Sequence, residues 1–425
     1  MTGLIAVKVA LDPSPCQLRL LASNAGGARF VFNFLLGRVI ENYRVNREAK
    51  RDGEPEPGYM DVSAYGLRKY WNTVKDDVAP WWRENSKEAY SYACSCVSDG
   101  VRNWLKSKTG KRKGRRAGFP RFKVKHGTDP AFAYTTGFRQ PSVDDPYHVW
   151  LPRIGSVHCM ENVPKRVGNG RVIRMNVKRH AERWYVILTV ERAVDPVPRV
   201  DEPDTVIGID LGVNHLATLS DGTVVENPRY YKRGERRLAH AQKSLSRKVK
   251  GSKRYEKARA RLSRAHAHVA YQRHDMLDKL TTSITRKYGV ISIEDLSVQG
   301  MTRNHNLAGS ILDAGFYEFR RMLEYKARLN GNTLYVAGKW YPSSKTCSSC
   351  GTVKAKLDLS ERVYHCDKCR FTIERDLNAA RNLAALAGSA PESQNERGGS
   401  IRRDPVQRGP ASPNETLTKQ GSTTL

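Results

Sequence analysis

The 425-residue sequence predicts a multidomain α+β protein, and three observations predict it. Apolar residues recur at helical spacing between about 17 and 106, which indicates a helical block. Short alternating runs between 131 and 190 are typical of an antiparallel β domain. Beyond residue 206, strand-like runs and amphipathic helices are joined by two Cys-x-x-Cys motifs, which indicates a mixed domain with a metal site.

In the first half, residues 1–11 predict a strand, and 17–44 and 65–106 predict helices. The β-like runs are 131–138, 148–159, 172–178 and 184–190. Their spacing predicts a small antiparallel barrel that the N-terminal strand also joins. The Pro-rich, acidic segment 192–204 is predicted to be a linker to the second half.

In the second half, a buried strand reaches Asp210, and a hairpin is predicted to turn at Asp221-Gly222. Two basic helices follow, separated by the sequence "KGSK". The remaining predicted elements are a strand in 289–298, a helix over 313–329 and a strand over 333–337. The end of the chain has few large apolar residues, so it is predicted to be disordered.

The charge balance favours a nucleic-acid partner. Lys and Arg number 73 against 43 Asp and Glu, which gives a net charge of +30. Nucleic acid is the polymer that most naturally offsets such a surplus. No apolar stretch reaches the ~18 residues of a membrane helix, and the start does not read as a secretory signal. We therefore expect a cytoplasmic protein, in a prokaryotic cytosol or nucleoid, that does not bind membranes.

Two segments concentrate this charge. Residues 106–125 hold ten Lys or Arg and no acid, and 232–264 hold 14 basic residues and two acids. A solvated linker or helix face would normally mix signs, so we predict that both segments contact phosphates. The candidate nucleic-acid-binding residues are Lys111, Arg112, Lys113, Arg115, Arg116, Arg121 and Lys123 in the first segment, and Arg247, Lys248, Lys250, Lys253 and Arg254 in the second.

The strongest local signal is Cys347-x-x-Cys350, then 15 residues, then Cys366-x-x-Cys369. Each Cys-x-x-Cys turn presents two sulfurs, and four thiolates complete a tetrahedral zinc site. Because no coordination position stays open, the sequence predicts a structural zinc ion. Unligated thiols and a redox pair are the weaker readings of the doubled motif.

Three acids form the candidate catalytic centre. Asp210 ends one apolar strand, Glu294 lies in a second, and Asp376 begins a predicted helix just after the cysteines. Singly, Asp376 reads as a helix-start carboxylate and Glu294 as the partner of an Arg. Together, they favour a site for Mg²⁺ or Mn²⁺, because hard oxygen ligands suit these ions.

Four stretches in this order carry a resemblance: "GIDLGVNHLATLSDG", "ISIEDLSVQGM", "WYPSSKTCSSCG…CDKC" and "ERDLNAARN". They resemble the split RuvC nuclease and zinc ribbon of TnpB, the transposon-encoded RNA-guided nuclease related to miniature type V CRISPR effectors. "GARFVFNFLL" and "GFPRFK" resemble the amino-terminal half of that family, so the resemblance spans about 1–386. It implies an RNase H-like core with catalytic Asp210, Glu294 and Asp376, a double-stranded DNA target, and a guide RNA derived from the transposon end.

The resemblance also implies a domain division. The expected domains are a wedge-like β-barrel (1–12 and 118–200), a helical recognition lobe ending in the basic segment (13–117), a RuvC-like core (201–345, with a basic helical hairpin at 229–288), a zinc ribbon (346–370), the last part of the core (371–390) and a disordered tail (391–425).

The chain departs from the family pattern at four positions. Arg370 stands where the family usually has Gly, and Glu374 where it often has Asp. Tyr271 and Asp278 replace an expected Asn and His.

The expected function is therefore RNA-guided DNA endonuclease of a transposable element. Asp210 is expected to bridge two divalent ions about 4 Å apart, with Glu294 and Asp376 holding one each. The alternatives are a catalytically idle RNA-guided repressor, a transposase, and an actin-like ATPase, because "GIDLG" also resembles an ATPase phosphate loop. The ATPase explains neither the charge nor the cysteines.

Overall fold

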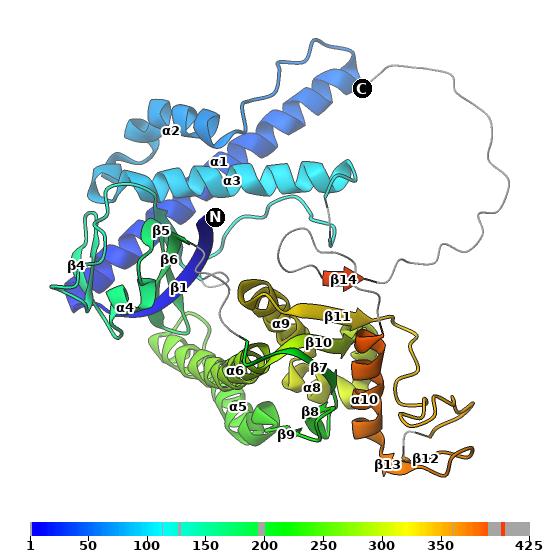
Figure 1. Cartoon of the computed structure of the whole chain (residues 1–425). Coiled ribbons are helices and arrows are strands. Elements are labelled where there is room, and N and C mark those ends of the chain that lie inside the picture. Colours follow the sequence, from blue (N-terminus) through cyan, green and yellow to red (C-terminus); the bar gives the residue numbers. More distant parts are fainter. Residues whose placement is uncertain are drawn as a thin grey trace. The chain divides into compact units, whose positions relative to one another are not determined.

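The computed structural model describes residues 2–112, 114–125, 129–193, 200–358, 360–389 and 401–403. The chain divides into two compact units, Met1–Val194 and Asp195–Leu425. Both combine helices with a sheet, so the predicted α+β class is confirmed (Figure 1). No helix in the described ranges is long and apolar enough to cross a membrane.

Among its described residues, the first unit contains six strands and the helices of the predicted helical block. Its elements are β1 (Thr2–Asp12), α1 (Pro15–Asp52), α2 (Ala64–Val78), the 3-10 helix η1 (Pro80–Glu84), α3 (Lys87–Lys108), β2 (Ala131–Tyr134), β3 (His148–Leu151), β4 (Gly155–Cys159), α4 (Val163–Val167), β5 (Arg171–His180) and β6 (Arg183–Ala193).

The sheet of the first unit has the order β2-β5-β6-β1-β4-β3, and all its pairings are antiparallel. The N-terminal strand joins it between β6 and β4, as the alternation of residues 1–11 predicts. Strands β2 and β3 remain edges within the described residues, so the sheet is open where a closed barrel was predicted. Closing this sheet into a barrel would require its edge strands β2 and β3 to pair with each other.

Helix α1 starts with a capping box, in which Ser14 and Gln17 satisfy each other's backbone amides. It continues without a break through Gly26 and Gly27. A Cβ atom at Gly27 would lie 3.1 Å from the Tyr90 ring, so this glycine allows α3 to approach closely. The predicted helix therefore extends to Asp52 and packs its buried face on α3.

The second unit holds the rest of the elements. They are β7 (Glu202–Asp210), β8 (His215–Leu219), β9 (Val224–Glu226), α5 (Tyr230–Ser246), α6 (Lys253–Lys287), β10 (Tyr288–Glu294), α7 (Val298–Met301), α8 (His305–Ala314), α9 (Phe316–Asn330), β11 (Thr333–Ala337), β12 (Val363–His365), β13 (Thr372–Glu374), α10 (Arg375–Gly388) and β14 (Ile401–Arg403).

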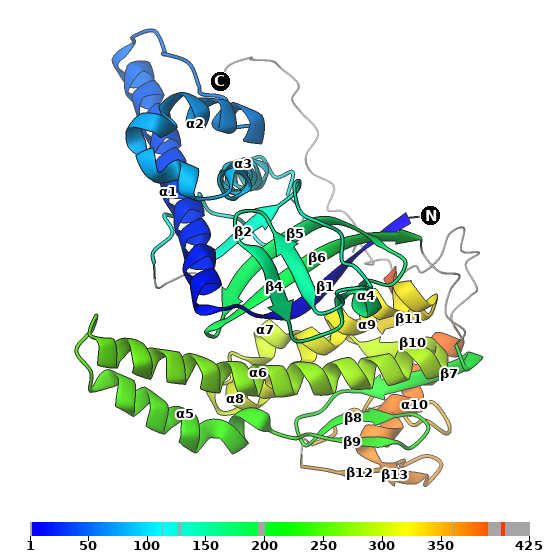
Figure 2. The ribbon, with the colours of Figure 1, turned by 90° about the vertical axis from the view of Figure 1, so that its left-hand side faces the viewer.

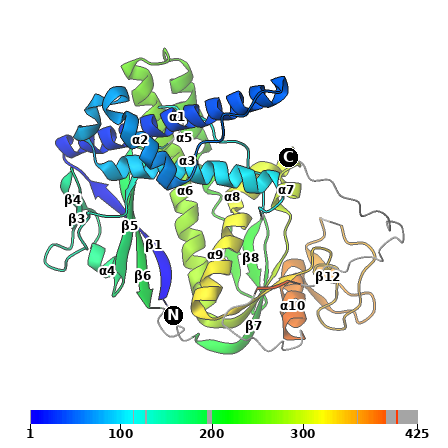
Figure 3. The same ribbon diagram turned by 90° about the horizontal axis from the view of Figure 1, so that it is seen from above.

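The main sheet of the second unit has the order β14-β11-β10-β7-β8-β9. Strands β7, β10, β11 and β14 are parallel, whereas β8 and β9 continue β7 as an antiparallel meander. Ile207, Ile209, Ile291 and Ile293 belong to one core with residues of α6 and α9. The opposite face is covered by α10, which lies against β7 (Figure 3).

Several sequence predictions of the second unit are confirmed, and two need correction. The hairpin turns at Gly222 with φ of +92°, and α5 and α6 lie side by side as a helical hairpin (Figure 2). The single helix predicted over 313–329 is two helices, because Gly315 takes φ of +73° between α8 and α9. Residues 401–403 pair with β11, so the disorder predicted for 391–425 is wrong for these three residues.

Two further predictions lie partly outside the described residues. The rest of the predicted tail, 391–400 and 404–425, is outside them, as is 194–199 of the predicted linker. Of its described residues, 192–193 belong to β6 and 202–204 to β7, whereas 200–201 lie in neither strand. The zinc-ribbon and RuvC boundaries stay predictions.

Candidate functional site

The ends of two adjacent parallel strands place Asp210 and Glu294 side by side. Strands β7 and β10 pair in register, with Ile209 opposite Ile293, so the residue that follows each isoleucine lies at the same sheet edge. Carboxyl ends of parallel strands are the usual location of functional groups in such sheets. Both isoleucines point into the core, so Asp210 and Glu294 point to the opposite face.

Helix α10 brings Asp376 to that same face. Gly208 shares the face of Asp210, and a Cβ atom there would lie only 2.0 Å from the carbonyl oxygen of Ala380. The helix backbone therefore rests directly on β7. Asp376 lies one helical turn before Ala380, in the first turn of α10, which places it near the strand ends.

The three carboxyl groups interact electrostatically. Enclosure by the surrounding protein raises the pKa of Asp210 well above its ordinary value, and the negative charges of Glu294 and Asp376 raise it further. Burial also raises the pKa of Glu294, while the Ser343 hydroxyl lowers it. Both side chains nevertheless remain partly exposed, so solvent and a substrate can reach them. The structure thus concentrates unfavourable negative charge at one accessible place.

The structure bears differently on the alternative role of each acid. Asp376 does lie in the first turn of a helix, where it accepts hydrogen bonds of 3.2 Å from Nε and Nη2 of Arg375. Glu294 accepts a hydrogen bond from the Ser343 hydroxyl. Among the described residues no Arg forms an ion pair with Glu294, so its pairing with an Arg is not observed.

The chemistry of the three acids suits cations. Their carboxylate oxygen atoms are hard ligands of the kind that Mg²⁺ or Mn²⁺ prefers. Arg375 offsets part of their charge by pairing with Asp376, and the negative charge that remains fits the presence of cations.

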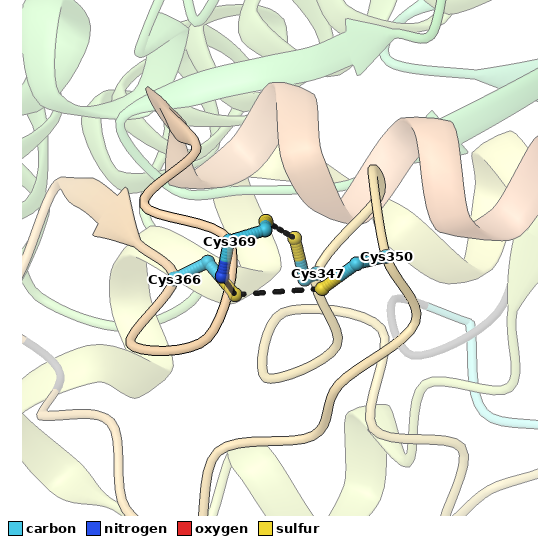
Figure 4. A group of neighbouring side chains, drawn as sticks. All are labelled: Cys347, Cys350, Cys366 and Cys369. Carbon is cyan, nitrogen blue, oxygen red and sulfur yellow. Dashed lines mark hydrogen bonds between the residues drawn. The ribbon is translucent and has the colours of Figure 1, made fainter.

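The four cysteines form a compact cluster (Figure 4). The sulfur atoms of Cys347 and Cys369 are 3.7 Å apart, and those of Cys350 and Cys366 are 3.6 Å apart. Tetrahedral zinc with bonds of ~2.3 Å separates its sulfurs by about 3.8 Å, so the cluster fits zinc. The neighbouring Thr352 lowers the pKa of the Cys350 thiol to about 6, which favours the thiolate that zinc binds.

The two Cys-x-x-Cys turns share a backbone hydrogen bond but differ in the residue that follows the second cysteine. In each turn the first cysteine accepts a backbone hydrogen bond of 2.9 Å, from Gly351 in one case and from Arg370 in the other. Both donors have positive φ, +73° for Gly351 and +57° for Arg370. Glycine adopts this conformation without strain, whereas an L-residue with a side chain is disfavoured there. The departure at Arg370 therefore introduces strain into the second turn.

Two asparagines tie the cysteine cluster to α10, and the sequence interpretation missed them. Asn378 donates to the carbonyl of Thr346 at 2.7 Å and accepts from the amide of Ser348 at 2.9 Å. Asn382 donates to the carbonyls of Ser343 and Thr346 at 2.7 and 2.6 Å. Both are buried. Their i, i+4 spacing in "RDLNAARN" was the available signal for a polar face on this helix.

The second basic segment forms an exposed surface. Its five candidate residues lie in and beside the turn between α5 and α6, and each has an exposed side chain. None of these five side chains forms an ion pair with another described residue. This surface presents unpaired positive charge, as a phosphate-contacting surface requires.

Only part of the first basic segment presents exposed positive charge. Lys111, Arg115, Arg116 and Arg121 are exposed, whereas Arg112 is half-buried and donates to the carbonyl of Arg115. Lys113 lies outside the described residues.

Lys123 does not fit the predicted phosphate contact. Its ammonium lies 4.0 Å from the centre of the Phe32 ring, and burial lowers its pKa. Its backbone exchanges two hydrogen bonds with Asn33. Lys123 thus fastens the segment to α1.

The departure at Asp278 has a structural partner. Its carboxylate lies 2.9 Å from Nζ of Lys326, a buried lysine that also donates to the carbonyl of Asp278 and to the hydroxyls of Thr281 and Thr282. The pair joins α6 to α9. Glu374 precedes α10 and adds to the negative charge around Asp210, and Tyr271 is exposed on α6. None of these departures removes one of the three acids.

Three protein families match segments of the chain. OrfB_IS605, described as "Probable transposase", matches residues 187–305, and Cas12f1-like, TNB domain, matches 316–383. A helix-turn-helix domain family matches 1–48, where the structure has strand β1 and most of the single helix α1.

Similar proteins extend over most of the chain. A protein of Mycobacterium tuberculosis (strain CDC 1551 / Oshkosh), named as an RNA-guided DNA endonuclease, is 36% identical over 89% of this chain and 85% of its own length. The similarly named InsQ of Escherichia coli (strain K12) is 30% identical over 92% of this chain and 94% of its own. The solved Cas12f1-sgRNA-target DNA complex aligns with 90% of this chain and 99% of its own, at 14% identity and a TM-score of 0.45.

Proposed function

The chain belongs to the TnpB family, and we propose that it is an RNA-guided DNA endonuclease of a transposable element, with Asp210, Glu294 and Asp376 as its catalytic residues. The full-length relatives named as RNA-guided DNA endonucleases support the activity. The main evidence for the site is that three acids far apart in sequence lie near the ends of β7 and β10. There the charges of Glu294 and Asp376 act on Asp210.

The topology of the second unit supports an RNase H-like core. An antiparallel meander of β7, β8 and β9 is continued by β10 and β11, which run parallel to the first strand of the meander. The family resemblance implies an RNase H-like core, and this mixed sheet agrees with that expectation. The sheet places the ends of β7 and β10 together, as a site that uses acids from both strands requires.

In the proposed site, Asp210 would bridge two divalent ions, and Glu294 and Asp376 would each hold one. Such ions supply an activated water and charge stabilisation at a phosphodiester, which yields a 5′-phosphate and a 3′-hydroxyl. The chain's own part is positioning. Ser343 orients Glu294 through its hydroxyl, and Arg375 holds Asp376 from the adjacent position.

The zinc cluster has a structural role in this proposal. All four ligand positions would be filled by cysteines, which leaves no position for a water or a substrate. Asn378 and Asn382 connect the cluster to the helix that carries Asp376. Zinc would therefore keep one catalytic acid in place without taking part in the reaction.

Guide RNA and target DNA would be held mainly through their phosphates. The exposed cations around the α5–α6 turn and those of 111–121 supply the positive surface. Pairing between guide and target would read the sequence, while the protein reads backbone shape and a short flanking motif. The guide is proposed to derive from the transposon end.

One preparation tests the proposal. The protein is expressed with the flanking transposon DNA and purified, and its bound RNA is sequenced. The complex is then given Mg²⁺ and a double-stranded library in which the sequence matching the guide is flanked by random bases. Guide-dependent cutting with 5′-phosphate ends is expected, and Asp210→Asn should remove cutting while target binding persists.

Three results would contradict the proposal. A preparation without bound RNA would count against a guide. Cutting that does not depend on the guide sequence, or strand joining in place of hydrolysis, would favour a transposase. Target binding without any cutting by the wild-type complex would favour the repressor.

A further inference from the structure

An exposed tryptophan stands at the tip of a turn that follows β11. The amide of Tyr341 donates to the carbonyl of Gly338 at 2.9 Å, so Lys339 and Trp340 occupy the two corner positions of a β-turn. Trp340 is 86% exposed, more than any other large apolar side chain whose exposure the structure describes. Exposure of this side chain gains nothing for folding, and it leaves a large aromatic face free to contact a ligand.

The turn is fastened to the acid cluster on both sides. Ala337, the last residue of β11, lies in register with Glu294. On the other side, the Ser343 hydroxyl donates to Glu294, and the Tyr341 hydroxyl donates to the carbonyl of Asn382 on α10 at 3.2 Å. These anchors fix the backbone of the turn next to the end of β10 that carries Glu294.

The chemistry of the turn fits a nucleobase and its phosphate. The ammonium of Lys339 lies 4.9 Å from the centre of the Trp340 ring, and this side chain is also exposed and forms no ion pair with a described residue. An indole face accepts any base by stacking, and the adjacent cation suits the phosphate of the same nucleotide. A base inside a duplex has both faces covered, so an unpaired nucleotide is the occupant that this platform fits best.

We propose that the Lys339–Trp340 turn is a stacking platform that receives one unpaired base of the DNA strand beside the phosphodiester held at Asp210, Glu294 and Asp376. This inference rests on the proposed nuclease function and adds a residue that sets the position of the strand. Trp340 is thus a positioning residue, since it touches the substrate away from the reacting atoms. Through the platform, the site selects locally opened DNA over paired DNA.

A cycle that changes both protein and DNA tests the platform. In complexes programmed with the same guide, Trp340→Ala is combined with abasic substitutions placed one at a time around the cut position. At one position the abasic change and Trp340→Ala should each slow single-turnover cutting by about 5- to 150-fold, and the two together should be no slower than either alone. Trp340→Phe should restore much of the rate, and Trp340→Ala should also broaden the distribution of cut positions.

A binding readout separates the platform from the nuclease. In the Asp210→Asn background, 2-aminopurine at that position should be quenched when the DNA strand binds, and Trp340→Ala should remove the quenching. Leu329→Ala is the matched control, because Leu329 is also exposed, at 47%, and lies at the end of α9 that leads to the opposite edge of the sheet. It should change neither readout.

Several outcomes would overturn the platform. The platform would be wrong if the rate reductions from Trp340→Ala and from the abasic substitution simply multiplied, or if Trp340→Ala left the rate unchanged. Neither result would contradict the proposed nuclease. A Trp340→Ala complex that has lost guide RNA but cuts normally per bound RNA would assign the indole to RNA. Failure of the wild-type complex to cut any target would instead refute the proposed function, and the 2-aminopurine signal would still decide the fate of the platform.

Discussion

The acid cluster and the cysteine cluster gather metal ligands in the same unit, yet they are built in opposite ways. The four sulfurs lie within 4.8 Å of one another, with pairs at 3.6 and 3.7 Å, close to the spacing of a filled tetrahedral site. At the acid cluster, burial and the charges of Glu294 and Asp376 raise the pKa of Asp210. One site is complete in itself, whereas the other carries charge that requires a partner.

The cysteine cluster is therefore a site that stabilises the fold, whereas the acid cluster is a site that destabilises it. A closed thiolate site contributes its binding free energy to folding. Enclosed carboxylates oppose folding until cations or substrate offset their charge. The hydrogen bonds of Asn378 and Asn382 join the two, so the stabilising site supports the strained one.

The largest effect is expected when the cysteine cluster is broken. Cys350→Ser should remove bound zinc, measured by elemental analysis, and should slow cutting by at least about 100-fold, because a displacement of about 1 Å in a catalytic group costs that much. The loss of zinc frees the turn that Asn378 and Asn382 hold. Cys16→Ser, at an exposed cysteine outside the cluster, should retain zinc and activity. Normal cutting by zinc-free protein would show that the two clusters are independent.

A smaller effect should follow when a support of the acid cluster is removed. Ser343→Ala leaves Glu294 without its hydroxyl partner and should slow cutting by about 10- to 100-fold, as loss of a hydrogen bond to a metal ligand typically does. The Mg²⁺ concentration needed for half-maximal rate should rise. Ser142→Ala removes an exposed serine hydroxyl from the segment before β3, outside the proposed site and contact surfaces, and serves as the control. An unchanged Mg²⁺ requirement would show that Ser343 does not support Glu294 as a metal ligand.

The acid cluster should be stabilised by the substitution that inactivates it. The pKa of Asp210 is raised in the folded protein above its unfolded value of about 3.9. The metal-free protein therefore loses stability as the pH rises from the unfolded pKa to the folded pKa of Asp210, and it stays destabilised at higher pH. Asp210→Asn should therefore raise the melting temperature at pH 7 by about 2–4 °C for each kcal/mol regained. The gain should shrink towards pH 4 and when Mg²⁺ stabilises the wild type. A lower melting temperature for Asp210→Asn would contradict the repulsion.

The smallest effect concerns the strain within the cysteine cluster. Arg370→Gly should stabilise the zinc-bound protein by about 1 kcal/mol, because glycine takes φ of +57° without a steric penalty. Gly351→Ala, in the matching turn, should destabilise it by a similar amount. Thermal unfolding of both variants with zinc present measures the pair. If both substitutions stabilised the protein, or both destabilised it, by similar amounts, the strain at Arg370 would not explain the difference between the two turns.

The sequence predicts the strands that carry the acids because their signals are local. Ile207, Ile209, Ile291 and Ile293 alternate with small or acidic residues, so both the strands and their polar ends are legible. The cysteine spacing is similarly local, and the structure brings its four sulfurs together. The family motifs add the order of these segments along the chain and their membership of one protein family.

Features set by tertiary contacts could not be predicted in this way. The apolar pattern runs through Gly315, and only its positive φ shows that two helices meet there. A basic composition does not reveal that the stem of Lys123 folds onto Phe32. Asn378 and Asn382 read as ordinary polar positions until the cysteine turn packs against them. Each of these features depends on a neighbour distant in sequence.

The contact at Gly208 has a consequence for protein engineering. No side chain fits between this residue and the backbone of α10, so the spacing of strand and helix is matched across about 170 residues of intervening chain. Chimeras that import α10 from a relative without the corresponding β7 would combine two surfaces shaped for other neighbours. The two segments should be exchanged as a pair, whereas the stretches between them that do not reach this contact can vary in length more freely.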